Sequence, residues 1–208
     1  MSPSPRGSAL LTAYEPFLGR PQNQSQEVVR LAAAREDFPA ACRVEFWPAI
    51  LPQLEARVEQ ALAAAPRFWL AVGEAGEDGV PLLETVARNH FDLGEDAAAA
   101  DGGPASGVLE PGGPEQVQAH WPAAALAEHL RSQGHQVELS QDAGAHCCNG
   151  VLWLATRRAA MSGAPRPWMG FLHLPRQPEQ RPQQAALVQA AVAWLGAQLA
   201  FSPGAGRG

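Results

Sequence analysis

The chain has 208 residues, of which 46% are hydrophobic, and this size suits one domain with a single sizeable core. Its net charge of −6 argues against a nucleic-acid partner, because phosphate binding requires clustered basic residues. No apolar run is long enough to span a bilayer, and the N-terminus lacks a signal-peptide pattern, so we expect no membrane contact. The three cysteines do not make a disulfide framework, which predicts reduced thiols and a cytoplasmic location.

Apolar segments of two kinds alternate along the chain. Compact apolar runs predict strands at 9–14, 42–46 and 68–72, and the last is dense enough for a strand buried on both faces of a sheet. Apolar residues at helical spacing predict helices at 24–35, 51–65, 126–130 and 187–199. Three further runs, at 136–139, 151–155 and 168–174, fit either a strand or a helix. This alternation predicts an α/β fold with a largely parallel or mixed sheet.

The domain organisation follows from the remaining segments. Residues 94–115 are rich in Ala, Gly, Pro and Asp, which predicts a long surface loop. Residues 1–7 and 202–208 are expected to be disordered tails. Because the chain has no internal repeat and no second hydrophobic unit, residues 1–208 are expected to form a single domain.

A thiol and an imidazole occur on separate predicted elements. A polar turn at 142–146 delivers Cys147 and Cys148 to the start of an apolar segment, and the later run 170–175 carries His173. An imidazole can take the proton of a thiol, and the resulting thiolate can attack a carbonyl. The residues alone fit a structural role as well, because cysteine often serves as a small buried hydrophobe and a histidine between leucines is commonly a core residue.

Four short motifs together identify a family. The chain reads T-A-Y-E-P-F-L-G at 12–19 followed by Asn23, then E-T-V-A-R-N at 84–89, D-A-G-A-H-C-C-N at 142–149 and G-F-L-H-L-P at 170–175. In this order and at comparable intervals they resemble T-G-F-x-P-F-G-G with its downstream asparagine, E-R-[VI]-A-x-N, S-A-G-x-x-x-C-N and G-F-[IL]-H-[VIL]-P of pyroglutamyl peptidase type I, or pyrrolidone carboxyl peptidase. The resemblance implies a single-domain, three-layer α/β/α sandwich with a mixed, mostly parallel sheet.

The resemblance also implies a reaction. A cysteine exopeptidase would hydrolyse the N-terminal pyroglutamyl residue from peptides through a thioester, with Cys148 as nucleophile, His173 as general base and Glu84 orienting the imidazole. Without the resemblance, Glu84 would be interpreted as a solvated glutamate on a helix. We expect Cys147 to pack in the core, and the N-terminus of the following helix to lower the pKa of Cys148. No cofactor is implied, and the chain has no C-x-x-C or H-x-x-x-H spacing for a metal.

The expected substrate is a peptide or a small amide. Tyr14 and Phe17 match the two aromatic positions that flank the flat pyroglutamyl ring in the family, although both could equally be core aromatics. Asn23 is a further polar match. Family members commonly assemble as homodimers or homotetramers, and Trp121 and the 94–115 loop are candidates for such contacts.

The loop at 73–78 departs from the family pattern. It reads G-E-A-G-E-D where the family has G-x-A-[PG]-G-R, so Asp78 replaces an arginine that supports the oxyanion in the family. Glu74 and Glu77 add carboxylates, and three acidic groups near the site would disfavour a thiolate and a developing oxyanion. We expect Glu74 to be among the substrate-binding residues.

Three further departures concern the substrate pocket and its loop. His146, also expected to bind substrate, stands where the family prefers a hydrophobic or aromatic residue. Ala13 and Leu18 replace glycines and are tolerated only if the backbone there avoids positive φ. These departures support a second hypothesis, a relative with the same fold that acts on another acyl or amide substrate or only binds a ligand.

Overall fold

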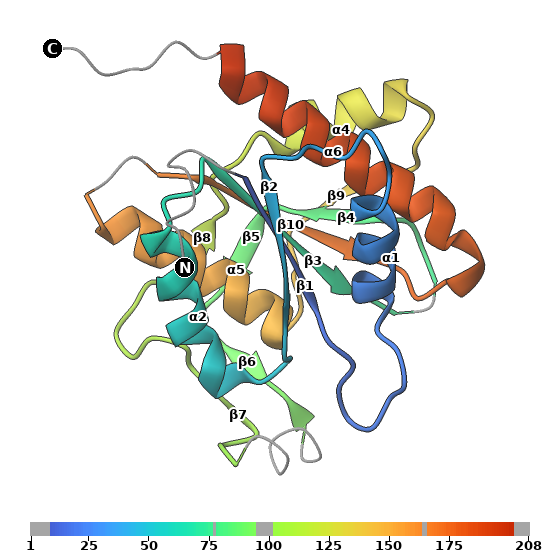
Figure 1. Cartoon of the computed structure of the whole chain (residues 1–208). Coiled ribbons are helices and arrows are strands. Elements are labelled where there is room, and N and C mark those ends of the chain that lie inside the picture. Colours follow the sequence, from blue (N-terminus) through green and yellow to red (C-terminus); the bar gives the residue numbers. More distant parts are fainter. Residues whose placement is uncertain (1–8, 77, 95–101, 164–165, 202–208) are drawn as a thin grey trace, which may run out of the picture.

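The central element of the fold is a six-stranded sheet. The structure is a computed structural model that describes residues 9–76, 78–94, 102–163 and 166–201. Across the sheet the order is β2-β1-β3-β10-β4-β9, and only the β4–β10 pair is antiparallel (Figure 1). The strands are β1 (Ala9–Tyr14), β2 (Cys42–Trp47), β3 (Phe68–Glu74), β4 (Leu82–Glu84), β9 (Glu138–Ser140) and β10 (Trp168–Leu174). The predicted mixed, mostly parallel sheet is therefore confirmed.

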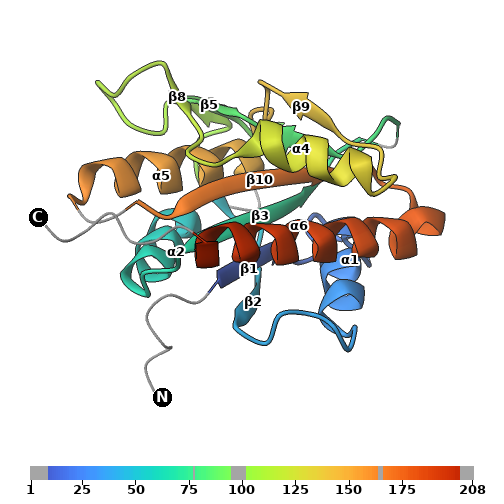
Figure 2. The same cartoon turned by 90° about the horizontal axis from the view of Figure 1, so that it is seen from above.

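Helices cover both faces of this sheet (Figures 1 and 2). One face carries α1 (Gln24–Ala33), α4 (Ala123–Ser132) and α6 (Arg181–Phe201), and the short 3-10 helix η1 (Pro178–Gln180) leads into α6. The other face carries α2 (Leu51–Ala63) and α5 (Cys147–Met161). In α2 the buried residues Leu54, Val58 and Ala61 recur at helical spacing, so one stripe of the helix faces the sheet. The three-layer α/β/α arrangement agrees with the prediction.

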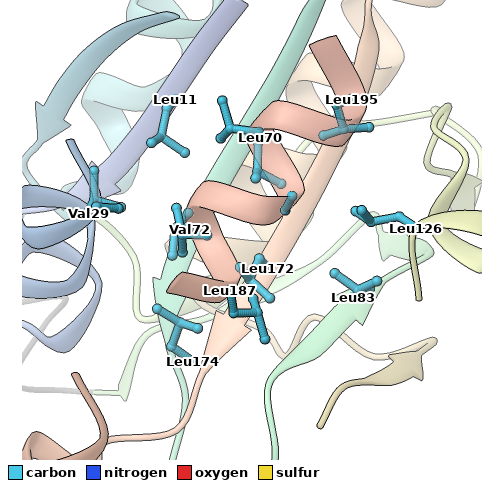
Figure 3. Close-up of a cluster of buried hydrophobic side chains, with 14 of the residues drawn as sticks. Leu11, Val29, Leu70, Val72, Leu83, Leu126, Leu172, Leu174, Leu187 and Leu195 are labelled. Carbon is cyan, nitrogen blue, oxygen red and sulfur yellow. The ribbon is translucent and has the colours of Figure 1, made fainter. Parts of the chain in front are cut away.

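Alternation of side chains along the strands divides the core into two layers. Figure 3 shows the layer on the α6 side, where Leu70 and Val72 of β3 pack beside Leu172 of β10. The intervening residues of β10, Phe171 and His173, point to the opposite face, toward α5. This alternation places His173 on the sheet face that the cysteine-bearing helix covers.

Two small ribbons extend the fold beside α5. Strands β5 (Val86–Arg88) and β8 (Gln116–Gln118) pair antiparallel, as do β6 (Phe91–Asp92) and β7 (Ser106–Gly107). The predicted 94–115 loop thus contains strand β7, and Glu110 anchors it through two hydrogen bonds from the guanidinium of Arg157 at 3.0 Å. Residues 95–101 and the predicted tails, 1–7 and 202–208, lie outside the described residues.

The three ambiguous runs resolve in two ways. The run 151–155 lies within helix α5, whereas 168–174 is strand β10 and 136–139 leads into strand β9. The helix predicted at 51–65 ends at Ala63, and Ala65 adopts a positive φ of 49° before Pro66. Among the described residues, no helix is both long and apolar enough to cross a bilayer.

Candidate active site

The N-terminus of α5 presents the two cysteines. Gly144 has a φ of 75°, and its N–H donates to Asp142 Oδ1 at 3.1 Å, so a tight polar turn precedes the helix. The buried Asn149 then ties the first turn to β5: its Nδ2 donates to the carbonyls of Arg88 and His90, and its Oδ1 accepts from Arg88 N, each at 2.8 Å. Asn149 therefore fixes the position of the helix start that carries Cys148.

The two thiols occupy different environments. Cys147 is 3% exposed and belongs to the hydrophobic layer between the sheet and α5, as expected. Cys148 is half-buried and its Sγ lies against the backbone of β3, because a Cβ on Gly73 would stand 2.7 Å from that sulfur. The ring of Phe171 is equally close, at 2.7 Å, so only glycine fits at position 73.

A buried imidazole–carboxylate pair lies on the same sheet face. His173 Nδ1 is 2.7 Å from Glu84 Oε1, and Glu84 is 0% exposed. The antiparallel pairing of β4 with β10 sets Glu84 opposite Phe171, two residues from His173. Because a carboxylate only accepts hydrogen bonds, Nδ1 carries the proton and Nε2 is left as the basic nitrogen. The interpretation of Glu84 as a solvated residue on a helix is wrong.

One cavity of about 420 Å³ connects these groups. It is lined by all eight residues that the sequence analysis assigned to the site: Tyr14, Phe17, Asn23, Glu74, Glu84, His146, Cys148 and His173. The residues lie at the end of β1 and in the segment after it, at the end of β3, on β4 and β10, and at the start of α5. Its volume suits a small planar acyl group.

The electrostatic setting of Cys148 differs from the expectation. Burial raises the pKa of the Cys148 thiol well above its ordinary value, the neighbouring Cys147, Glu84 and Glu74 act in the same direction, and only its own backbone N–H opposes them. The expected lowering by the helix N-terminus is therefore wrong, because desolvation of the thiolate outweighs it. The raised pKa keeps the Cys148 thiol protonated at neutral pH.

Glu74 is charge-balanced rather than a free acid. Its Oε1 accepts from Arg20 Nη2 at 2.6 Å and lies 3.8 Å from Arg176 Nη1, while its Oε2 accepts from the backbone N–H of Gln24 at 2.7 Å. Asp78 is exposed and does not line the cavity. The expectation that acidic groups disfavour the thiolate agrees with the effect of Glu74, which raises the Cys148 pKa, and is wrong for Asp78, while Glu77 lies outside the described residues.

Tyr14 and Phe17 approach the cavity from the end of β1. Tyr14 is 5% exposed and its hydroxyl donates to the Cys147 carbonyl at 2.9 Å. Phe17 is half-buried, with the guanidinium of Arg20 5.3 Å from its ring centre. Leu18 adopts a φ of 53°, so the condition stated for this replacement of glycine is not met, whereas Ala13 meets it in strand β1.

Asn23 and His146 are both held by backbone groups. Asn23 caps α1: its Oδ1 accepts from Ser25 N at 2.9 Å and from Ser25 Oγ at 2.7 Å. The imidazole Nε2 of His146 lies 3.1 Å from the Leu93 carbonyl, so this nitrogen is the donor. Each side chain lines the cavity while it serves a structural hydrogen bond.

Comparison with known proteins agrees with this geometry. The family model described as pyroglutamyl peptidase matches residues 8–194. The chain belongs to the pyroglutamyl peptidase family. A pyrrolidone-carboxylate peptidase of Cupriavidus necator is 30% identical over 189 residues, which cover 88% of this chain and 86% of that relative.

Solved structures agree on the fold. The pyrrolidone carboxyl peptidase of Thermus thermophilus is 26% identical, with a TM-score of 0.73 over 88% of this chain and 98% of that chain. The enzyme of Thermococcus litoralis, at 20% identity, has a TM-score of 0.79 over 97% of this chain and 98% of that chain, which shows the shared fold. The predicted family, fold and cysteine-type exopeptidase class are confirmed.

Trp121 supports the site of this pyroglutamyl peptidase family member in a way that the sequence analysis missed. Its Nε1 donates to the Glu84 carbonyl at 3.0 Å. Its ring lies close to the backbone of β10, because a Cβ on Gly170 would stand 2.1 Å from it. The signal was the glycine in G-F-L-H-L-P, which leaves room for a large neighbouring ring. The contacts of Trp121 with Glu84 and with Gly170 lie within the chain, and its part in contacts between subunits stays a prediction.

Proposed function

We propose that the chain removes the N-terminal pyroglutamyl residue from peptides, with Cys148 as nucleophile, His173 as general base and Glu84 orienting His173. The observation that carries this proposal is the buried His173–Glu84 pair, 2.7 Å apart, on the wall of the cavity that Cys148 also lines. A thiol, an imidazole and a carboxylate that line one cavity are the groups that nucleophilic acyl transfer by a cysteine requires.

The reaction would run in two halves. His173 Nε2 accepts the Cys148 proton as the thiolate attacks the pyroglutamyl carbonyl, and Glu84 stabilises the imidazolium that forms. The tetrahedral intermediate collapses to a thioester when His173 returns the proton to the leaving amine. A water molecule, deprotonated by His173, then attacks the thioester, and pyroglutamate leaves as Cys148 regains its proton. A neutral resting thiol fits this sequence, because its proton is transferred during the attack.

The cavity offers features suited to a lactam ring. Tyr14 and Phe17 present aromatic surface, which favours a flat and weakly polar ring. Glu74, Asn23 and His146 would supply the polar part of the wall. The reaction requires no metal or organic cofactor. Cytoplasmic location and assembly as a homodimer or homotetramer remain predictions from the sequence.

A second candidate keeps the same fold and nucleophile but acts on another acyl or amide group or only binds a ligand. The loss of the family's loop arginine, whose place Asp78 takes, and the polar His146 in the pocket favour it. The charge balance of Glu74 by Arg20 and Arg176 weakens one argument for this candidate, because the cavity wall is less acidic than the loop sequence suggests.

Hydrolysis of a fluorogenic pyroglutamyl amide under reducing conditions tests the proposal. Turnover by the wild-type chain and by Cys147→Ala, with loss in Cys148→Ala, would support it. Cys147→Ala is the matched control, since it removes the adjacent thiol from a buried position outside the proposed chemistry. A folded wild-type protein that leaves the amide intact while iodoacetamide still alkylates Cys148 would favour the second candidate instead.

A further inference from the structure

The hydroxyl of Tyr14 adds a hydrogen bond beside the nucleophile that a phenylalanine at this position could not make. We infer that Tyr14 is a positioning residue: its hydroxyl orients and polarises the Cys147–Cys148 peptide, so that the Cys148 N–H serves as the donor to the oxyanion formed when Cys148 attacks a carbonyl. The observation is the 2.9 Å hydrogen bond from Tyr14 Oη to the Cys147 carbonyl. The inference deepens the proposed function, on which it rests for the acyl substrate.

The peptide that Tyr14 contacts also carries the Cys148 N–H. Its C=O and N–H belong to one rigid plane, so a hydrogen bond that fixes the carbonyl also fixes the N–H. That N–H lies beside the reacting sulfur, since it is the backbone group that lowers the Cys148 pKa. A hydrogen bond accepted by the carbonyl draws electrons from the N–H and strengthens it as a donor.

Tyr14 is suited to hold this bond permanently. It is 5% exposed at the end of β1, and its backbone N–H donates to Ser25 Oγ at 3.2 Å. Burial, followed by the proximity of Cys148 and Cys147, raises the pKa of the Tyr14 phenol well above its ordinary value, so the hydroxyl keeps its proton at neutral and mildly alkaline pH. Both the hydrogen bond to the Cys147 carbonyl and the effect of Cys148 on the Tyr14 pKa show that the phenol lies close to Cys148.

The cavity offers little positive charge from arginine side chains to stabilise an oxyanion. No arginine is among the described residues that line it. Arg20 and Arg176 face Glu74, and Arg88 pairs with Asp142 at 2.9 Å. Without an arginine among the described lining residues, the orientation of the backbone donors matters more than in a site with a free guanidinium.

The test compares two reactions of the same sulfur. Acylation by p-nitrophenyl acetate forms an oxyanion, whereas alkylation by iodoacetamide does not, and neither reagent requires pyroglutamyl specificity. Cys42→Ala and Cys147→Ala leave Cys148 as the sole thiol of the chain and keep the backbone carbonyl at position 147. Tyr14→Phe is introduced into this background. Thr12→Val is the matched control, because Thr12 is a buried hydroxyl on the same strand that bonds Trp69 Nε1 at 2.9 Å, away from the cavity.

We expect Tyr14→Phe to slow acylation about two- to eightfold. One oxyanion donor contributes roughly 10²- to 10³-fold to the rate, and losing the Tyr14 hydrogen bond should remove about 10–30% of the free energy behind that contribution. Alkylation should slow less than acylation, because the same N–H is only a minor influence on the Cys148 pKa, and Thr12→Val should change neither rate. Equal slowing of both reactions, or no slowing of acylation, would overturn the inference. Because the reagents bypass the natural substrate, a failure of the proposed function would appear only as missing pyroglutamyl amide turnover, with the acylation difference intact.

Discussion

Glu84→Gln should change catalysis and thiol reactivity in opposite directions. The substitution keeps the size of the side chain and removes its charge. Glutamine can turn its amide N–H₂ toward His173 Nδ1, which would place the imidazole proton on Nε2, where it cannot accept the Cys148 proton. It also withdraws the carboxylate that stabilises the imidazolium across a 2.7 Å hydrogen bond.

The loss of turnover should be large. The corresponding Asp-to-Asn change in a Ser-His-Asp triad lowers kcat by about 10⁴-fold, so we expect a fall of roughly 10³- to 10⁴-fold in pyroglutamyl amide hydrolysis. Stability should change by no more than about 1 kcal/mol, because two contributions oppose each other. The charged hydrogen bond to His173 is weakened, but a fully buried Oε2 that has no hydrogen-bond partner among the described residues no longer carries charge.

Thiol alkylation should respond in the other direction. Burial is the main reason why the Cys148 pKa is raised, followed by Cys147 and then by the negative charge of Glu84. Removing that charge lowers the Cys148 pKa, so iodoacetamide should alkylate the variant faster than wild type at pH 8. The assay is the alkylation rate measured beside kcat/KM. If both rates fell together in a folded variant, Glu84 would not act through His173 as argued.

Three further predictions concern stability, each measured by urea unfolding. Burial raises the pKa of Cys42 to about 12. The stability that the buried, neutral thiol contributes is therefore fully present below the pKa of the unfolded thiol and is lost as pH rises toward 12. Cys42→Ala should therefore reduce the fall in unfolding free energy above about pH 9 by ~1.4 kcal/mol per pH unit, and an unchanged slope would contradict this. Leu18→Gly should stabilise the fold by about 1 kcal/mol, because the exposed Leu18 holds a φ of 53°, and a loss of stability would show that its side chain contributes more than its backbone costs. Gly170→Ala should cost about 2–3 kcal/mol, because the added Cβ would lie 2.1 Å from the Trp121 ring, and a neutral result would mean that Trp121 can move away freely.

The sequence predicted elements best where local pattern and environment agree. Strand β3 reads as a dense apolar run because it is buried on both faces, and α2 shows a single apolar stripe because only one side faces the sheet. Helix α5 stayed ambiguous because its residues from Asn149 to Thr156 are all buried, which removes helical periodicity. Strand β4 has three residues, and its pairing with β10 makes it a strand.

The site could be assembled from motifs, but its electrostatics could not. The eight candidate residues, which come from the motifs and from the loop at 73–78, all line one cavity. The partners of Glu74, Arg20 and Arg176, come from two other loops, and no local signal links them. The direction of the Cys148 pKa shift depends on how far the fold desolvates the thiol, which a helix-start pattern does not reveal.

The most direct test of the central claim is to trap the acyl intermediate. A pyroglutamyl ester is mixed with the enzyme, the reaction is quenched in acid within its first turnover, and the modified peptide is sequenced by mass spectrometry. The account predicts a pyroglutamyl group on Cys148, with Cys147 unmodified, and no adduct in Cys148→Ala. Turnover without any adduct on Cys148, or an adduct on Cys147, would contradict it.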